Sequence, residues 1–185
     1  MRVAMPVLAL VCVLGLLAAL VGGCGHESAS RGATQTGPAP SSEPQIQGQA
    51  AAGRAAADFS FTSLQGKPVK LGDFSGKPLV VNFWASWCPY CVQEAPDLQA
   101  LYDKYRGQGL QVVGIAGSDT EEALKAKVKE LKLTYPVGIS EAAGSAYGVQ
   151  GIPHTFFITK DGKIASEAVG LRPKDQLEAE IKKIL

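Results

Sequence analysis

Residues 58–185 alternate between two kinds of hydrophobic pattern. Short apolar or β-branched runs bounded by glycine, proline or polar residues indicate strands, and apolar residues spaced three or four apart indicate amphipathic helices. This order of elements gives an α/β domain with a mixed central sheet flanked by helices. The predicted elements are a hairpin at 58–71, strands at 79–84, 110–117, 136–139, 154–159 and 163–169, and helices at 88–106, 118–131, 142–147 and from Pro173 onward.

Local signals mark the ends of several of these elements. Asp161-Gly162 lies between two apolar runs and is a strong hairpin signal. Ser118 and Glu121 have the spacing of a capping box, which predicts that the second helix opens at Ser118.

The first residues of the chain are strongly apolar. No charged residue interrupts the run from Val3 to Val21, which is long enough for the apolar region of an export signal or for a marginal transmembrane helix. The run ends in Gly22-Gly23-Cys24, which resembles the bacterial lipobox, where the signal is cleaved and the cysteine is lipidated. We therefore expect a signal peptide at 1–23 and a lipid on Cys24, with an uncleaved anchor helix as the alternative.

Residues 24–57 differ from the rest of the chain in composition. They are mainly Gly, Ala, Ser, Pro and Gln, with almost no large aliphatic residues. Such a segment cannot form a core and is predicted to be a flexible linker after the lipid anchor. The domain at 58–185 is then expected outside the cytoplasm, held by the lipid on the periplasmic or outer face of a bacterial membrane.

The charge of residues 58–185 excludes one class of partner. Basic and acidic residues occur there in equal numbers, whereas a nucleic-acid-binding domain normally has a basic excess. We expect a monomer that does not bind nucleic acid.

Cysteine usage directs attention to one short segment. The chain has four cysteines; Cys12 lies in the predicted signal and Cys24 would carry the lipid. Cys88 and Cys91 remain, in the sequence WCPYC.

This pair has three possible uses. As a structural disulfide it would close a very short loop, and the stabilisation from a disulfide grows with loop length. A structural zinc site would need two further ligands, and the only histidines are His26 and His154. A redox-active Cys88/Cys91 dithiol is the use that fits an exported protein with a lone C-x-x-C pair.

Three motifs resemble one known family: VVNFWASWCPYC, the following Pro96, and GIPHTFFITKDGKI. They are similar to the thioredoxin fold and, within it, to the TlpA/ResA branch of membrane-tethered thiol-disulfide oxidoreductases. The resemblance covers nearly all of 58–185. It implies a thioredoxin fold with an N-terminal β-hairpin and an inserted helix-strand unit at 118–139.

The resemblance also implies an activity and partners. The protein would reduce disulfides of exported proteins, with the haem-binding cysteines of apocytochrome c as the leading substrate class, and would draw electrons from a membrane donor protein. Neither a cofactor nor a metal is expected.

The chemistry of the pair follows from its place at a helix start. At the helix N-terminus, unpaired N–H groups and the helix dipole would stabilise a Cys88 thiolate. We expect Cys88 to be the exposed attacking thiol and Cys91, one turn further in, to be the resolving thiol.

Five neighbours are expected to contact the substrate. Trp87 would be either an apolar wall beside the sulfur or plain core packing, while Pro89 and Tyr90 set the geometry between the cysteines. Ile152-Pro153 resembles the cis-proline loop that faces the dithiol in thioredoxin folds and pairs with an extended substrate.

Three further positions, Asn82, Glu94 and His154, have alternative interpretations. Thioredoxins usually have a buried aspartate at the place of Asn82, and Glu94 matches an acidic position of ResA-like proteins and is the candidate replacement. A helical glutamate is otherwise a surface charge, so burial with a raised pKa would distinguish the two readings. His154 could support a thiolate or point away from the dithiol along the strand.

Two other functions compete with thiol-disulfide exchange. A copper-binding assembly chaperone akin to Sco proteins would use Cys88, Cys91 and His154 as ligands, although Sco proteins have three residues between the cysteines. A thioredoxin-fold peroxidase would have a threonine at the place of Ala85.

Overall fold

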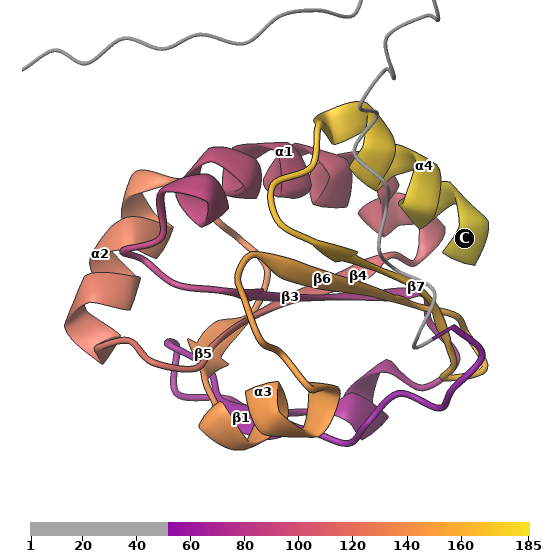
Figure 1. Cartoon of the computed structure of the whole chain (residues 1–185), viewed down its shortest axis with the longest axis horizontal. Helices are drawn as coiled ribbons and strands as arrows, with labels where there is room; N and C mark the ends of the chain where they lie inside the picture. Colours follow the sequence, from indigo (N-terminus) through magenta and orange to yellow (C-terminus); the bar gives the residue numbers. More distant parts are fainter. Residues whose placement is uncertain (1–51) are drawn as a thin grey trace, which may run out of the picture. The chain divides into compact units, whose positions relative to one another are not determined.

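The computed structural model describes residues 52–185 (Figure 1). The predicted signal peptide at 1–23, the lipid site at Cys24 and most of the linker lie outside the described residues. Among the residues described, none of the helices has the length and apolar character needed to cross a membrane.

The elements follow the predicted order. The strands are β1 (Ser60–Thr62), β2 (Pro68–Lys70), β3 (Leu79–Trp84), β4 (Gln111–Ala116), β5 (Val137–Ile139), β6 (His154–Ile158) and β7 (Ile164–Val169). The α-helices are α1 (Pro89–Tyr105), α2 (Glu121–Glu130), α3 (Glu141–Tyr147) and α4 (Lys174–Ile184), with short 3-10 helices η1 (Leu71–Phe74) and η2 (Arg106–Gln108).

A mixed five-stranded sheet lies at the centre, in the order β5-β4-β3-β6-β7. Strands β3, β4 and β5 are parallel, whereas β6 runs antiparallel to β3 and β7 antiparallel to β6. Strands β1 and β2 form a separate antiparallel hairpin. The mixed sheet, the hairpin and the inserted α2–β5 unit confirm the predicted architecture.

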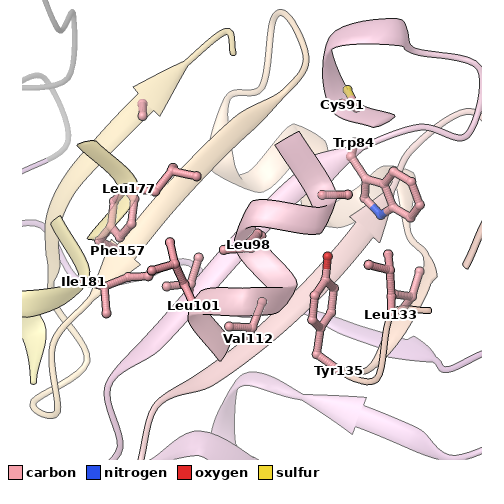
Figure 2. Packing of buried hydrophobic residues seen from close by; sticks show 14 of the residues in the cluster. Trp84, Cys91, Leu98, Leu101, Val112, Leu133, Tyr135, Phe157, Leu177 and Ile181 are labelled. Atoms are coloured by element: carbon pink, nitrogen blue, oxygen red, sulfur yellow. The ribbon is translucent and has the colours of Figure 1, made fainter. Parts of the chain in front are cut away.

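Helices cover both faces of the sheet (Figure 1). The core on one face joins residues of α1, α2 and α4, and the core on the other face joins α3 and the β1–β2 hairpin. Figure 2 shows the first of these, where Leu98 and Leu101 of α1 pack near Phe157 of β6 and Ile181 of α4.

Strand β3 is central and buried on both faces, as its apolar sequence predicted. Val80 and Trp84 belong to the α1 side, and Val81 and Phe83 belong to the α3 side. Asn82 lies between them and is buried too. Its amide therefore faces the helix α1 from a position in the middle of the sheet.

The start of α2 differs from the prediction. Thr120, rather than Ser118, is the N-cap, and its side chain accepts a hydrogen bond from the Ala123 N–H. The two residues before Thr120 make tertiary contacts instead: the Ser118 carbonyl accepts the indole N–H of Trp87 at 2.9 Å, and Asp119 accepts Ser86 N at 2.6 Å. The helix begins two residues later than predicted, after a tertiary contact.

The hydrogen-bonded part of the chain begins before Asp58. Gly53 N donates to Ile164 O at 2.8 Å, and Ala56 N donates to Gly162 O at 2.9 Å. Backbone groups make these contacts, so the scarcity of large side chains in this segment does not prevent them.

Candidate redox-active site

The Cys88–Cys91 pair lies at the start of α1. Cys88 is the N-cap in extended conformation, Pro89 is the first helical residue, and the Cys88 sulfur accepts a hydrogen bond from Cys91 N at 3.2 Å. Proline fits this position because its fixed φ suits a helix and its missing N–H would have had no helical partner. The two cysteines are joined as a disulfide with a Cα–Cα distance of 5.3 Å. The same backbone N–H can stabilise a thiolate once the disulfide is reduced.

The exposure of Cys88 differs from the expectation. Cys88 is 4% exposed and Cys91 is 2% exposed, so neither residue stands out at the surface in the disulfide form. The neighbouring large side chains do: Trp87 is 64% exposed and Tyr90 is 61% exposed. The exposed rim of the site is therefore apolar, and the sulfur atoms lie below it.

The loop that faces the disulfide contains a cis peptide bond between Ile152 and Pro153, as the resemblance implied. The Cys88 sulfur lies 3.9 Å from the Ile152 carbonyl oxygen. Pro153 O accepts a hydrogen bond from Gly170 N at 2.8 Å, which ties this loop to the end of β7. The sulfur and the backbone of the loop are thus close enough to engage one polypeptide together.

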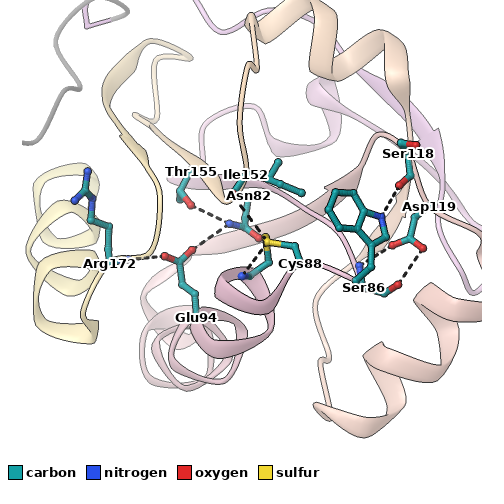
Figure 3. Close-up of a disulfide and its surroundings, with 11 residues drawn as sticks. Asn82, Ser86, Cys88, Glu94, Ser118, Asp119, Ile152, Thr155 and Arg172 are labelled. Atoms are coloured by element: carbon teal, nitrogen blue, oxygen red, sulfur yellow. Dashed lines mark hydrogen bonds between the residues drawn. A yellow bond between two sulfur atoms is a disulfide. The ribbon is translucent and has the colours of Figure 1, made fainter. Parts of the chain in front are cut away.

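The inserted unit holds the loop in front of Cys88 (Figure 3). The Asp119 carboxylate accepts Ser86 N at 2.6 Å and Ser86 Oγ at 3.0 Å. The Trp87 indole donates to Ser118 O at 2.9 Å. Trp87 is therefore a fixed, exposed wall of the site and is not part of the core. Sequence reasoning missed Asp119 and Ser86, which come together only in the folded chain.

Glu94 lies on α1 three residues after Cys91 and is 2% exposed. Its Oε2 accepts Arg172 N at 2.9 Å, and its Oε1 lies 3.4 Å from Asn82 Nδ2 (Figure 3). Burial raises the pKa of Glu94 from 4.5 to about 7, with the Arg172 N–H partly opposing that rise. Glu94 is thus buried and has a raised pKa, and the surface-charge alternative is wrong.

Asn82 positions Glu94 and cannot itself exchange a proton. Its Nδ2 also donates to Thr155 Oγ1 at 2.9 Å, so the amide bridges helix α1 and strand β6. Thr155 lies opposite Asn82 in the β3–β6 ladder. No sequence pattern indicated Thr155 or Arg172, since both reach the site from distant parts of the chain.

His154 points away from the dithiol. It is buried on the α3 side of the sheet, stacks on Phe156 at 4.3 Å between ring centroids, and its Nε2 lies 3.2 Å from the Glu167 carboxylate. Burial lowers the pKa of His154 below its usual value, although Glu167 opposes the shift. A neutral histidine on the far face does not support a thiolate.

The ligand set of a copper chaperone is also not assembled. Cys88 and Cys91 lie in the core on the α1 side, whereas His154 lies on the other side. Within residues 52–185, no group of three His, Cys, Asp or Glu side chains is placed to hold a metal ion.

The site combines a cysteine pair at a helix N-terminus with a cis-proline loop that faces it, on a mixed sheet between helices. These features define a thioredoxin-fold thiol-disulfide exchange site. The family model described as AhpC/TSA family matches residues 52–167. Thiol-disulfide oxidoreductase ResA of Bacillus thuringiensis subsp. konkukian (strain 97-27) is 40% identical over 134 residues, covering 71% of this chain and 78% of the relative. ResA of Geobacillus thermodenitrificans (strain NG80-2) is 31% identical over 136 residues, covering 72% of this chain and 78% of the relative.

Solved structures agree with these relatives. A thiol:disulfide interchange protein of the thioredoxin family from Chlorobium tepidum TLS superposes with a TM-score of 0.65 at 31% identity, covering 70% of this chain and 94% of that one. A secreted Mycobacterium tuberculosis disulfide oxidoreductase homologous to E. coli DsbE has a TM-score of 0.62 at 26% identity, covering 68% and 95%.

The chain belongs to the AhpC/TSA family and, within it, to the ResA/TlpA branch of thiol-disulfide oxidoreductases. Its fold is the thioredoxin fold and its activity is thiol-disulfide oxidoreduction, as predicted. Ala85, three residues before Cys88, offers no hydroxyl group at the place where the peroxidase reading would need a threonine.

Proposed function

We propose that this protein is a membrane-tethered reductant that opens disulfides in exported proteins through Cys88 and Cys91. One observation carries the proposal: the pair caps the N-terminus of α1, and Glu94, with a pKa of about 7, is buried three residues further along the helix. A helix N-terminus stabilises the attacking thiolate, and a carboxyl group that exchanges protons near neutral pH can assist the resolving thiol; together they suit disulfide reduction.

In the first step, the Cys88 thiolate attacks one sulfur of the substrate disulfide. A bond forms between Cys88 and that sulfur, and the other substrate sulfur leaves as a thiolate. Trp87, Tyr90 and the cis Ile152-Pro153 loop position the substrate around the reacting sulfur.

In the second step, Cys91 attacks the Cys88 sulfur. The Cys91 thiol gives its proton to the Glu94 carboxylate, the Cys88–Cys91 bond forms, and the bond between Cys88 and the substrate sulfur breaks. That substrate sulfur leaves as a thiolate and takes up a proton. The substrate gains two electrons and the enzyme dithiol loses them. A membrane donor protein then reduces the Cys88–Cys91 disulfide again.

The location is part of the same proposal. The apolar run up to Val21, the small residues before Cys24 and the linker that follows support export, lipid attachment at Cys24 and a tether to residues 58–185. Intact-mass analysis of the membrane-extracted protein tests this part, and an unmodified Cys24 would refute lipidation.

The residues between the two cysteines bear on the direction of electron flow. Pro89-Tyr90 is also the pair found between the cysteines of glutaredoxins, and a strongly stabilised reduced form would make the couple an oxidant. Apocytochrome c, with its haem-binding cysteines, is the leading substrate class that the resemblance to the TlpA/ResA branch implies.

Equilibration with glutathione buffers at neutral pH tests the direction. We expect a reduction potential below that of protein disulfide isomerase, which is about −180 mV. A value well above about −180 mV would overturn the reductant assignment and leave a disulfide donor in its place.

A further inference from the structure

His154 joins the loop that faces the dithiol to the central sheet. It follows Pro153 directly and is the first residue of β6, where it lies opposite Phe83 of β3. The Ile152 carbonyl oxygen, two residues earlier in the chain, is 3.9 Å from Cys88 Sγ (Figure 3). A change in the position of His154 would therefore reach the loop through no more than two residues.

Two neighbours hold the His154 side chain on the α3 side of the sheet. Its ring stacks on Phe156 with 4.3 Å between centroids, and its Nε2 lies 3.2 Å from a carboxylate oxygen of Glu167. Glu167 lies opposite Phe156 in the β6–β7 ladder, so its side chain extends from the same face of the sheet. The exposed fractions of the side chains are 8% for His154 and 13% for Glu167. Because the pair is largely removed from water, a charge on the ring is costly there.

The two nitrogen atoms of the ring have different surroundings. In the neutral form, Nε2–H donates to Glu167 and Nδ1 carries a lone pair. Nδ1 is buried, and no group within residues 52–185 forms a hydrogen bond with it. A protonated ring would place a second N–H at Nδ1, and this buried donor would have no acceptor. The neutral ring therefore fits this position and the protonated ring does not.

The groups around the ring decide which effect is larger. From β7, Glu167 attracts a protonated ring, and from β3 the apolar Phe83 lies opposite it. From α3, Tyr147 packs against Phe156, and burial raises the pKa of Tyr147, so this group stays uncharged. Burial lowers the pKa of His154 although Glu167 opposes the shift, so the cost of burying the charge exceeds the attraction. Protonation thus favours a position of the ring nearer to solvent.

We propose that His154 is a positioning residue for the loop at Ile152-Pro153 and that acid reverses its effect. Neutral His154, bound to Glu167, keeps the loop where one polypeptide can contact both the loop and Cys88. Protonated His154 leaves this place, and the loop moves with it. The inference rests on the proposed reduction of polypeptide disulfides and adds its regulation: binding of the polypeptide weakens as the surroundings become acidic.

The test compares two disulfides that differ in whether they can contact the loop. One is the symmetric disulfide dimer of a short peptide with blocked termini and no titratable side chain besides cysteine. The other is hydroxyethyl disulfide, which has no polypeptide backbone. Both oxidise the reduced full-length protein, kept in mild detergent, through the same two cysteines. The ratio of the peptide rate to the hydroxyethyl disulfide rate therefore cancels the titration of the thiols and of Glu94.

We expect this ratio to fall about tenfold between pH 7.5 and pH 4.5, because a buried donor without an acceptor shifts an equilibrium by about that factor. The midpoint should lie below pH 6.5, since burial lowers the pKa of His154 from that value. A ratio that is independent of pH would overturn the proposal and leave the proposed function standing.

The variant His154→Gln removes the titration and keeps a donor for Glu167. We expect its ratio to be independent of pH and close to that of the unmodified protein at pH 7.5. His26→Gln is the matched control, because His26 is the other histidine of the chain and lies outside the described residues. Its ratio should fall as in the unmodified protein. The same fall in His154→Gln would contradict the assignment to His154.

A second variant retains the histidine and keeps the test decisive if His154→Gln folds poorly. Glu167→Gln preserves an acceptor for Nε2–H but removes the charge that raises the pKa of His154. We expect the midpoint of the fall to move to lower pH, whereas a merely structural role of Glu167 would change the ratio equally at every pH. An unshifted midpoint would refute the proposal. Failure of the unmodified protein to reduce the peptide at pH 7.5 would instead refute the proposed function itself.

Discussion

Replacing Glu94 by glutamine should make the folded protein more stable at high pH. The pKa of Glu94 rises from 4.5 to about 7 on folding, chiefly because the carboxyl group is buried. Between these two values, folded Glu94 keeps its proton while the unfolded chain releases it. The free energy of unfolding therefore falls as pH rises through this window, and the loss is complete above about pH 7.

The size of the effect follows from the pKa change. One unit of pKa corresponds to about 1.36 kcal/mol, so a rise from 4.5 to about 7 destabilises the ionised folded protein by about 3 kcal/mol. Glutamine has nearly the same shape and keeps an oxygen that can accept the Arg172 N–H. Its amide also faces Asn82 Nδ2, which adds a change in stability that is the same at every pH. The diagnostic quantity is thus the difference between the two proteins as a function of pH.

Urea unfolding of the oxidised fragment 52–185 between pH 4.5 and 8.5 measures this difference. We expect the stability of Glu94→Gln relative to the unaltered fragment to rise by about 3 kcal/mol across the range, because every other titrating group cancels in the comparison. Glu122→Gln on the exposed face of α2 is the matched control and should give a flat difference. A flat difference for Glu94→Gln as well would refute the link between burial and proton affinity.

Three further predictions concern the N-terminal segment, the two cysteines and Asp119. The fragment 52–185 should be soluble, folded and redox-active. The shorter fragment 58–185 should unfold at a lower urea concentration, because it lacks the hydrogen bonds from Gly53 and Ala56. Equal urea midpoints for the two fragments would show that these bonds do not contribute to stability. Cys91→Ser should trap a mixed disulfide through Cys88, and Cys88→Ser should trap little; peptide mapping of the partner onto Cys91 would reverse the two roles. Asp119→Ala should lower the free energy of unfolding by about 1.5–3 kcal/mol, since Ser86 loses hydrogen bonds to a charged group. Asp119→Asn should lower the free energy of unfolding by less. Unfolding curves of Asp119→Ala that match those of the unaltered protein would show that this contact does not stabilise the fold.

The elements and the reactive pair could be predicted because their signals are local. The apolar run of β3, the turn at Asp161-Gly162 and the proline after Cys88 each determine a few adjacent residues. The order of such segments then restricts the fold to a small number of sheet topologies. The place of Cys88 at a helix start was predicted from such local signals, and the cis bond before Pro153 was predicted from the resemblance to the family.

The surroundings of the pair could not be predicted because they depend on distant contacts. Asp119 meets Ser86 across 33 positions of sequence, and Arg172 meets Glu94 across 78. Periodicity could not show that Glu94 is buried, since the helix position alone suits a surface charge. The start of α2 also involves distant contacts: Ser118 and Asp119 bind Trp87 and Ser86, and the helix is capped by Thr120.

The destabilisation that Glu94 brings is explained by the proton balance of the proposed exchange. When Cys91 attacks Cys88, its thiol must lose a proton, and the substrate thiolate that leaves must gain one. An exposed glutamate, with a pKa of about 4.3, would hold a proton too weakly to serve both steps near neutral pH. Burial raises the pKa of Glu94 to about 7, and the neutral amide of Asn82 adds no second proton-binding group. In the proposed exchange, the same burial that weakens the folded state above pH 7 gives the resolving step its proton carrier.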